Sequence, residues 1–251
     1  MKQLSKWILG ILAFSILSPA SADTNSIFIS LGPDFSRLNN DEYVSINNMV
    51  VNEYKSNNAT NSKFIWGAGI AHTFNNIYCT PISISLGLAD YFIDYGHVSG
   101  IKYPLVNDGI YDSLNYKFEA KSNALMLESR FYYDYKSWQP FILVGAGNAW
   151  NKLSDYSEVP TNPSLSAAPG TVLYGSHTET SFAYELGLGI QHDLFNCVKK
   201  RVLFSGSLDY RYINTGKGRL NNFPAITTND HLKINNLNTQ ALMFSITAAL
   251  Y

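Results

Sequence analysis

Five charged residues lie within otherwise apolar or small-residue segments, and their spacing suits ion pairing inside a protein. They are Glu128, Arg130, Glu185, Asp209 and Arg211. Residues two positions apart in an extended chain point to the same side, which puts a carboxylate beside a guanidinium in two of the segments. A buried charge is costly unless it is paired, so the spacing predicts one cluster of ion pairs in an enclosed interior. A hairpin turning about Cys197 would put Glu185 opposite Asp209. Arg211 would then be the diagonal neighbour of Glu185.

The histidines do not form a metal-binding pattern. His72 and His192 fall in segments where apolar and polar residues alternate. His97 and His231 fall in polar connections. No two of these histidines have the spacing of zinc ligands, so we expect neither a metal site nor a bound cofactor.

Alternation of apolar and polar residues predicts the strands that must position the charged side chains. In residues 181–193 every second residue is large and apolar, and the residues between them are small or polar. Such a period of two is typical of strands with two different faces. Eight segments show it, at residues 26–32, 63–74, 77–93, 115–133, 140–151, 178–193, 201–214 and 237–251.

The connections between these segments alternate in length. Those at 75–76, 134–139 and 194–200 are short, and those at 33–62, 94–114, 152–177 and 215–236 are long and polar. Outer-membrane barrels have short periplasmic turns and long extracellular loops. The sequence therefore predicts an all-β fold, an eight-stranded antiparallel up-and-down transmembrane β-barrel with both termini in the periplasm.

The two faces of each predicted strand differ in bulk. In 63–74, Phe64 and Trp66 alternate with Gly67 and other small residues. Side chains fill the interior of an eight-stranded barrel, so we expect Gly, Ala and Ser inside and bulky apolar residues facing lipid. In 140–151 both faces are apolar, and Trp150 favours an even-numbered lipid face although Asn148 shares it. We expect the charged cluster to close the lumen; a gated pore through the cluster is the alternative.

The two cysteines, Cys79 and Cys197, both fall near short turns at the periplasmic rim. An exported protein folds in an oxidising compartment, which permits a disulfide. Their hairpins lie on different sides of the barrel, and a disulfide requires Cα atoms within about 7 Å. A bond would need the turn with Cys197 to fold beneath the lumen, so a disulfide and two free thiols both remain open.

The ends and composition of the chain indicate export. Residues 1–22 have the pattern of a cleaved signal peptide, with Lys2 and Lys6 before an apolar stretch and Ala20-Ser21-Ala22 at the cleavage site. A membrane-anchor helix is the alternative, but the stretch at 7–17 is too short to span a bilayer. Residues 23–251 suffice for one barrel domain. The net charge of −1, without a basic stripe, argues against nucleic-acid binding.

Several segments resemble the small eight-stranded outer-membrane barrels of Gram-negative bacteria, of the OmpA-like and opacity-protein type. They are Pro140-Phe-Ile-Leu-Val-Gly-Ala-Gly147, Phe182-Ala-Tyr-Glu-Leu-Gly-Leu-Gly-Ile190, Leu208-Asp-Tyr-Arg-Tyr212 and the last strand ending in Tyr251. The resemblance implies a location in the bacterial outer membrane, insertion by the barrel-assembly machinery, contact with outer-membrane lipids and lipopolysaccharide, and a monomer. Tyr251 departs from the family pattern, because it is out of phase with the apolar face of the last strand.

Some barrels that resemble this chain modify lipids. The nearest candidate here, His177-Thr-Glu-Thr180, lacks the His-x-Ser arrangement of the lipid A deacylase family, so we expect no enzyme. We expect a structural or adhesin-like surface protein that presents long loops to host or surface ligands. The alternatives are a narrow porin-like channel for small or hydrophobic solutes, and a soluble exported barrel with its apolar face turned inward around a ligand.

Overall fold

The structure is a computed structural model that describes residues 23–250 except 39–40, 48–49, 58–59, 76, 78–79, 105–112, 163–173, 199–200 and 223–229. The predicted signal peptide, residues 1–22, lies outside the described residues, as does Tyr251. The strands are β1 (Thr24–Arg37), β2 (Glu42–Asn47), β3 (Val50–Ser56), β4 (Thr60–Phe74), β5 (Ile82–Tyr103), β6 (Leu114–Tyr133), β7 (Trp138–Pro160), β8 (Tyr174–Gly175), β9 (His177–Cys197), β10 (Val202–Arg219), β11 (Asn221–Asn222) and β12 (Lys233–Leu250). Within these ranges no helix is long and apolar enough to cross a membrane.

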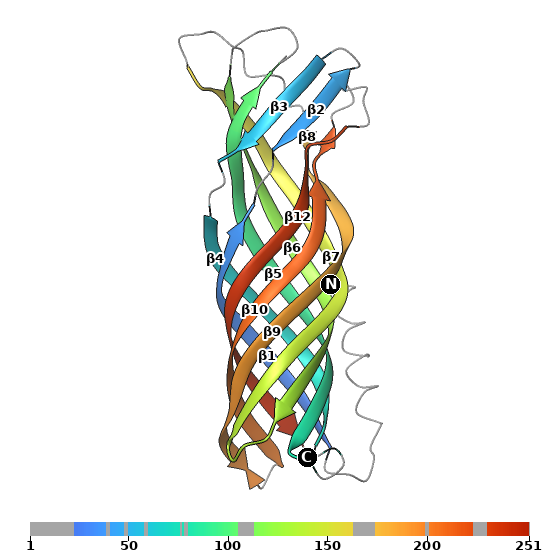
Figure 1. The fold of residues 1–251 in the computed structure, drawn as a ribbon, viewed down its shortest axis with the longest axis vertical. Coiled ribbons are helices and arrows are strands. Elements are labelled where there is room, and N and C mark those ends of the chain that lie inside the picture. The colour runs from blue at the N-terminus through green and yellow to red at the C-terminus, as the bar shows by residue number, and fades with distance from the viewer. Residues whose placement is uncertain are drawn as a thin grey trace.

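Eight of the described strands form a closed ring. The order around the ring is β1, β4, β5, β6, β7, β9, β10 and β12, each antiparallel to its neighbours. β1 pairs with both β4 and β12, so the first and last strands close the barrel. The barrel stands upright in Figure 1, with short turns at one end and long strand extensions at the other. The predicted eight-stranded up-and-down barrel is confirmed.

The strands extend further at the long-loop end than the sequence predicted. β5 continues to Tyr103 and β7 to Pro160, through residues predicted to be loops. The predicted loop at 33–62 contains the hairpin of β2 and β3, whose second strand pairs with the upper part of β5 (Figure 1). The loop prediction was wrong there because β5 offers an unpaired edge above the ring, and a short apolar-polar repeat can pair with it.

The first short turn also differs from the prediction. Residues 77–93 were predicted to form one strand after the short connection at 75–76, but β5 begins at Ile82. Thr80 closes a turn by donating from its backbone nitrogen to the Ile77 oxygen at 3.0 Å. Pro81 follows this turn, and its lack of an N–H removes it from the strand ladder.

The outward face carries the large apolar side chains, as predicted. Phe64 and Trp66 are 67% and 58% exposed, whereas Ile65 between them is buried. In β7 Ile142 and Trp150 are exposed. Asn148 lies on the same outward face, so the even-numbered lipid face of β7 is confirmed.

The interior is divided into two halves of different character. In the half near the short turns, small hydroxyl residues are buried, as predicted: Ser30, Ser83, Ser85, Ser205, Ser207 and Ser245. In the half near the long loops, large side chains are buried instead: Ile65, Tyr95, Phe118, Met126, Leu153 and Ile234. Large side chains are also buried near the short turns, among them Phe28, Tyr132 and Phe141. The prediction of small residues inside was therefore only partly right, because small and large neighbours interdigitate into a packed core.

Candidate functional site: a closed lumen

The five predicted charged residues meet inside the barrel and form the ionic plug, together with Tyr91 of β5. They are Glu128 and Arg130 of β6, Glu185 of β9, and Asp209 and Arg211 of β10, all buried. Each one lies at a buried position of an alternating strand, so the pleat directs it inward. The plug therefore joins four strands across the lumen.

Arg211 is the centre of the ionic plug. Its Nη1 lies 3.4 Å from Glu185 Oε2 and 3.5 Å from Glu128 Oε1. Its Nε donates to Asp209 Oδ2, and its Nη2 donates to Asp209 Oδ1 at 3.3 Å. The same Nη1 also donates to the Tyr91 hydroxyl. A guanidinium has five N–H donors in a fixed fork, which suits it to several acceptors at once.

Arg130 and Glu128 form the second part of the plug. Arg130 Nη2 and Nε donate to Glu128 Oε2 at 2.9 and 3.2 Å. Tyr91 donates its hydroxyl to the other oxygen of Glu128. The Arg130 guanidinium also lies 4.5 Å from the centre of the Phe28 ring, a cation–π geometry. Glu128 thus connects both arginines.

The predicted hairpin register was wrong by several residues. Asp209 pairs with Gly189 and Arg211 with Gly187, whereas Glu185 pairs with Ile213. The hairpin turns after Cys197, not about it, and its register shifts between Phe204 and Ser205. Glu185 therefore does not lie opposite Asp209; the long side chain of Arg211 reaches it along the lumen.

Glycines make room for the ionic plug, a role that the sequence did not reveal. A Cβ at Gly145 would lie 2.5 Å from Glu185 Oε1. A Cβ at Gly67 would overlap the Tyr91 ring, and one at Gly189 would overlap the Asp209 side chain. Because these inward glycines have no side chain, a charged or aromatic side chain from a neighbouring strand can occupy the space beside them.

A second layer, of apolar side chains, fills the lumen on the long-loop side of the plug. Tyr95, Met126, Ile213 and Leu237 are fully buried members of one hydrophobic cluster. The Tyr95 hydroxyl lies 2.7 Å from Thr215 Oγ1, so its polar atom is paired. Side chains of this size, packed against one another, fill this part of the lumen.

A third layer, which we call the outer cluster, lies beyond the second in the strand extensions. Lys102 Nζ and Glu158 Oε1 are 2.6 Å apart, and the two side chains are only 3% and 4% exposed. Tyr156 donates its hydroxyl to Glu158, and the hydroxyls of Tyr54 and Tyr174 lie 3.2 Å apart. Burial lowers the pKa of Lys102, although the charge of Glu158 opposes this. These residues fell in predicted loops, where no alternation marked them.

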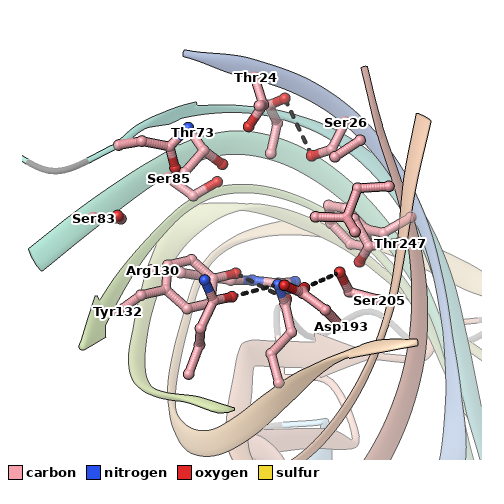
Figure 2. Close-up of a pocket in the computed structure, with 17 residues that line it drawn as sticks. Thr24, Ser26, Thr73, Ser83, Ser85, Arg130, Tyr132, Asp193, Ser205 and Thr247 are labelled. Carbon is pink, nitrogen blue, oxygen red and sulfur yellow. Dashed lines mark hydrogen bonds between the residues drawn. The ribbon is translucent and has the colours of Figure 1, made fainter. Parts of the chain in front are cut away.

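A cavity of about 130 Å³ lies on the other side of the plug, at the short-turn end. Figure 2 shows its lining, which includes hydroxyl side chains such as Ser85 and Thr247 as well as Arg130 and Tyr132. Ser205 Oγ donates to Asp193 Oδ1 at 2.9 Å in the same wall. We call this cavity the vestibule; it ends at Arg130 of the ionic plug.

The outer surface is built for contact with hydrocarbon. Exposed apolar side chains surround the ring, and they include Ile27, Ile29, Leu31, Leu86, Leu88, Leu127, Phe131, Ile142, Phe182, Leu186, Leu188, Leu208, Leu242, Phe244 and Ile246. A continuous apolar surface of this size is not stable in water, and a closed barrel is the β-structure that can satisfy its backbone within a membrane. The chain is a transmembrane β-barrel of the outer-membrane type. The prediction of an outer-membrane location agrees with this surface.

Several solved structures are similar in fold. Neisserial surface protein A has 9% identity and a TM-score of 0.44, over 92% of this chain and 98% of that protein. Outer membrane protein OprG from Pseudomonas aeruginosa has 14% identity and a TM-score of 0.36, over 91% and 97%. The attachment invasion locus protein Ail of Yersinia pestis has 15% identity and a TM-score of 0.34, over 90% and 99%. The sequence matches no protein-family model and no curated protein. The strand pairing and the apolar outer surface therefore carry the assignment.

The other predicted sites fall at the rims. Cys197 has a free thiol near the short-turn end, and Cys79 lies outside the described residues. His177 begins β9 at the opposite end, and Glu179 beside it pairs with Lys217 at 3.5 Å. Among the described residues no three His, Cys, Asp or Glu side chains are placed to hold a metal ion.

Proposed function

We propose that the chain is a non-enzymatic surface protein of the outer membrane, of the OmpA-like and opacity-protein type, whose closed barrel presents the long-loop end to the environment in a structural or adhesin-like role. Outer-membrane lipids and lipopolysaccharide surround its apolar belt, the barrel-assembly machinery inserts it, and it acts as a monomer. Host or surface ligands bind through its loops. Loops on a rigid scaffold are the usual place for such binding.

The observation that carries the proposal is the fully buried guanidinium of Arg211 within the ionic plug. A conducting pore needs water along its axis, and water would reach this group. Instead Arg211 is bound to Asp209, Glu128 and Glu185, with apolar packing on one side of it. The interior thus serves stability, and the long-loop end is left to carry function.

The β2–β3 hairpin at the long-loop end supports the proposed display role. The hairpin of β2 and β3 extends the sheet beyond the ring (Figure 1). Tyr43 in this hairpin is exposed, and its hydroxyl donates to Glu53 Oε1 at 2.7 Å. The outer cluster supports the hairpin from below, because Tyr54 of β3 belongs to both. A rigid support of this kind reduces the entropy that a loop loses when it binds.

The alternative function is a narrow channel for small or hydrophobic solutes. The vestibule favours it, since it is a cavity of about 130 Å³ at the short-turn end whose wall mixes hydroxyl and apolar side chains. Passage would require the plug and both further layers to open together. The vestibule on its own is equally suited to holding water against the buried hydroxyls.

A display experiment tests the proposal. Cells producing the full chain are compared with cells producing a variant in which residues 42–56 are replaced by a short Gly-Ser linker, and adhesion to host cells or matrix is measured. We expect both proteins to be folded, as judged by a mobility shift on heating in detergent, and adhesion to fall only for the variant. The Ser83→Ala variant in the vestibule is the matched control and should adhere normally. Equal adhesion by all three would contradict the display role.

A further inference from the structure

The vestibule is lined by inward side chains from all eight strands of the ring, and a row of hydroxyls forms one side of it. Thr24 of β1 is the register partner of Thr73 on β4, and Thr73 is the partner of Ser85 on β5. Ser85 in turn pairs with Arg130 of β6, so the row ends at a guanidinium of the ionic plug. Side chains of directly opposite residues start about 5 Å apart, so one small ligand can reach several of them.

A second row faces the same cavity from the other half of the ring. Thr247 of β12 is the register partner of Ser205 on β10, and Ser205 is the partner of Asp193 on β9. This row also ends at a charged group, here a carboxylate (Figure 2). Phe28 and Leu203 add apolar surface to the lining. The wall therefore offers hydroxyls and apolar groups to the same occupant.

The two charged residues of the described lining favour neither an anion nor a cation. Arg130 donates to Glu128 through both Nη2 and Nε, at 2.9 and 3.2 Å. Asp193 Oδ1 accepts the Ser205 hydroxyl at 2.9 Å. Because a guanidinium and a carboxylate share one small cavity, a ligand of either charge would meet repulsion as well as attraction. The lining suits a neutral ligand.

The hydroxyls of the first row can bond to a ligand. Ser85 is only 4% exposed, and its hydroxyl has no hydrogen-bond partner among the described residues. It lines the cavity beside Thr73 (Figure 2). Ser207 gives the contrast, because its Oγ also lacks a partner in the described chain but is inaccessible and lines no part of the vestibule. A buried hydroxyl that reaches a cavity without a partner takes its hydrogen bond from what fills the cavity.

The vestibule has room for a small ring. Its volume of about 130 Å³ is several times what one water molecule needs. An apolar cavity of about 150 Å³ in another protein holds a benzene molecule. The mixed wall of the vestibule suits a ring that carries hydroxyls around its edge and C–H groups on its faces.

From this arrangement we propose that the vestibule binds a neutral sugar of hexose size from the periplasm. The hydroxyls of the sugar would exchange hydrogen bonds with Thr73, Ser85 and Thr247, since a hydroxyl both donates and accepts. Its C–H faces would lie against Phe28 and Leu203. The pocket is blind, because the ionic plug forms its floor, so the sugar enters and leaves at the short-turn end. The proposal does not depend on the display role of the opposite end.

Titration of the full-length barrel with D-glucose tests the proposal. The protein is held in a phosphocholine detergent, which has no sugar headgroup to compete, and saturation-transfer NMR measures the contact of ligand protons with the protein. We expect a saturable signal from glucose and a much weaker one from cyclohexanol, which keeps the ring size but has one hydroxyl. Ser85→Ala and Thr73→Val should each weaken the affinity for glucose by about two- to tenfold, the effect of losing one hydrogen bond.

The matched control is Ser207→Ala, which also removes an inward hydroxyl without a partner in the described chain, but not one that faces the vestibule. It should bind glucose as the wild type does, and the heat-induced mobility shift checks that every variant is folded. An equal loss of affinity in all three variants would overturn the proposal, as would no loss in Ser85→Ala and Thr73→Val.

Two further results would also overturn the sugar site. The absence of a saturable glucose signal would mean that the vestibule holds only water, and equal binding of glucose and cyclohexanol would mean that its hydroxyls select nothing. Titration with maltotriose distinguishes a free sugar from the end of a longer glycan as the source of the ligand. Failure of these tests leaves the display role possible, whereas failure of adhesion leaves the sugar site intact.

Discussion

Each charged side chain in the ionic plug is stabilised by the opposite charges of the others. Three carboxylates meet two guanidiniums there, and Arg211 contacts all three of the acids. Glu185 Oε1 has no hydrogen-bond partner among the described residues, so this acid depends on Arg211. Breaking a buried ion pair by removing one member leaves an uncompensated charge, which costs more than the pair contributes.

Replacement of Arg211 by methionine tests this dependence. We expect Arg211→Met to lower the free energy of unfolding by about 3–5 kcal/mol, because Asp209 and Glu185 lose their buried cation. Urea unfolding in lipid vesicles, followed by tryptophan fluorescence, measures it. Lys152→Met on the exposed face should change the value by less than about 0.5 kcal/mol. Equal values for the two variants would mean that the plug contributes nothing to stability.

A glycine substitution tests the space around the plug. Gly145→Ala places a Cβ 2.5 Å from Glu185 Oε1, so Glu185 has to move away from Arg211. We expect a loss of about 1–3 kcal/mol in the free energy of unfolding, the usual cost of overpacking. Gly175→Ala is the control, since a Cβ there meets no atom within 4 Å. A Gly145→Ala variant as stable as the control would show that the space between Gly145 and Glu185 is loosely packed.

At the scale of elements, the extensions of β5 and β7 carry the outer cluster beyond the membrane-spanning ring. They carry Lys102 and Glu158 into a layer shared with Tyr54 of the β2–β3 hairpin. The hairpin, the extensions and the outer cluster therefore form one folded unit above the ring.

A double-mutant cycle tests the Lys102 and Glu158 pair. Lys102→Met should cost about 3–5 kcal/mol in the free energy of unfolding, because Glu158 is left buried without a cation. Adding Glu158→Leu should recover most of this loss, since an apolar pair needs no compensation. The partly exposed pair of Lys55 and Glu53 is the control and should show a coupling below about 1 kcal/mol. If the double variant were no more stable than Lys102→Met alone, the buried Glu158 would not be the source of the loss.

The sequence predicted the elements of the ring because lipid imposes a strict rule on them. Phe64 and Trp66 must face hydrocarbon and Gly67 must face the lumen, so alternation is sharp within the belt. Beyond the belt this rule ends, and Tyr54 and Lys102 were missed as members of a packed layer. The identities of the plug residues were predicted because charge is excluded from the lipid face. Their register was not, because it depends on the length of the turn after Cys197.

At the scale of the whole molecule, three layers close one lumen: the ionic plug, the apolar layer around Tyr95 and the outer cluster. The ionic plug and the outer cluster both contain buried ion pairs, and the layer between them is apolar. A gated pore through the lumen would have to open all three layers. Under the proposed function, ligands bind at the long-loop end of the barrel.

Conductance in planar lipid bilayers tests the closed lumen most directly. Purified wild-type protein and Arg211→Met are inserted, and the heat-induced mobility shift confirms that each barrel is folded. We predict no reproducible ohmic conductance from either protein, because the apolar layer and the outer cluster still seal the lumen when the plug is broken. Reproducible ohmic conductance from the folded wild type would contradict the closed-barrel account.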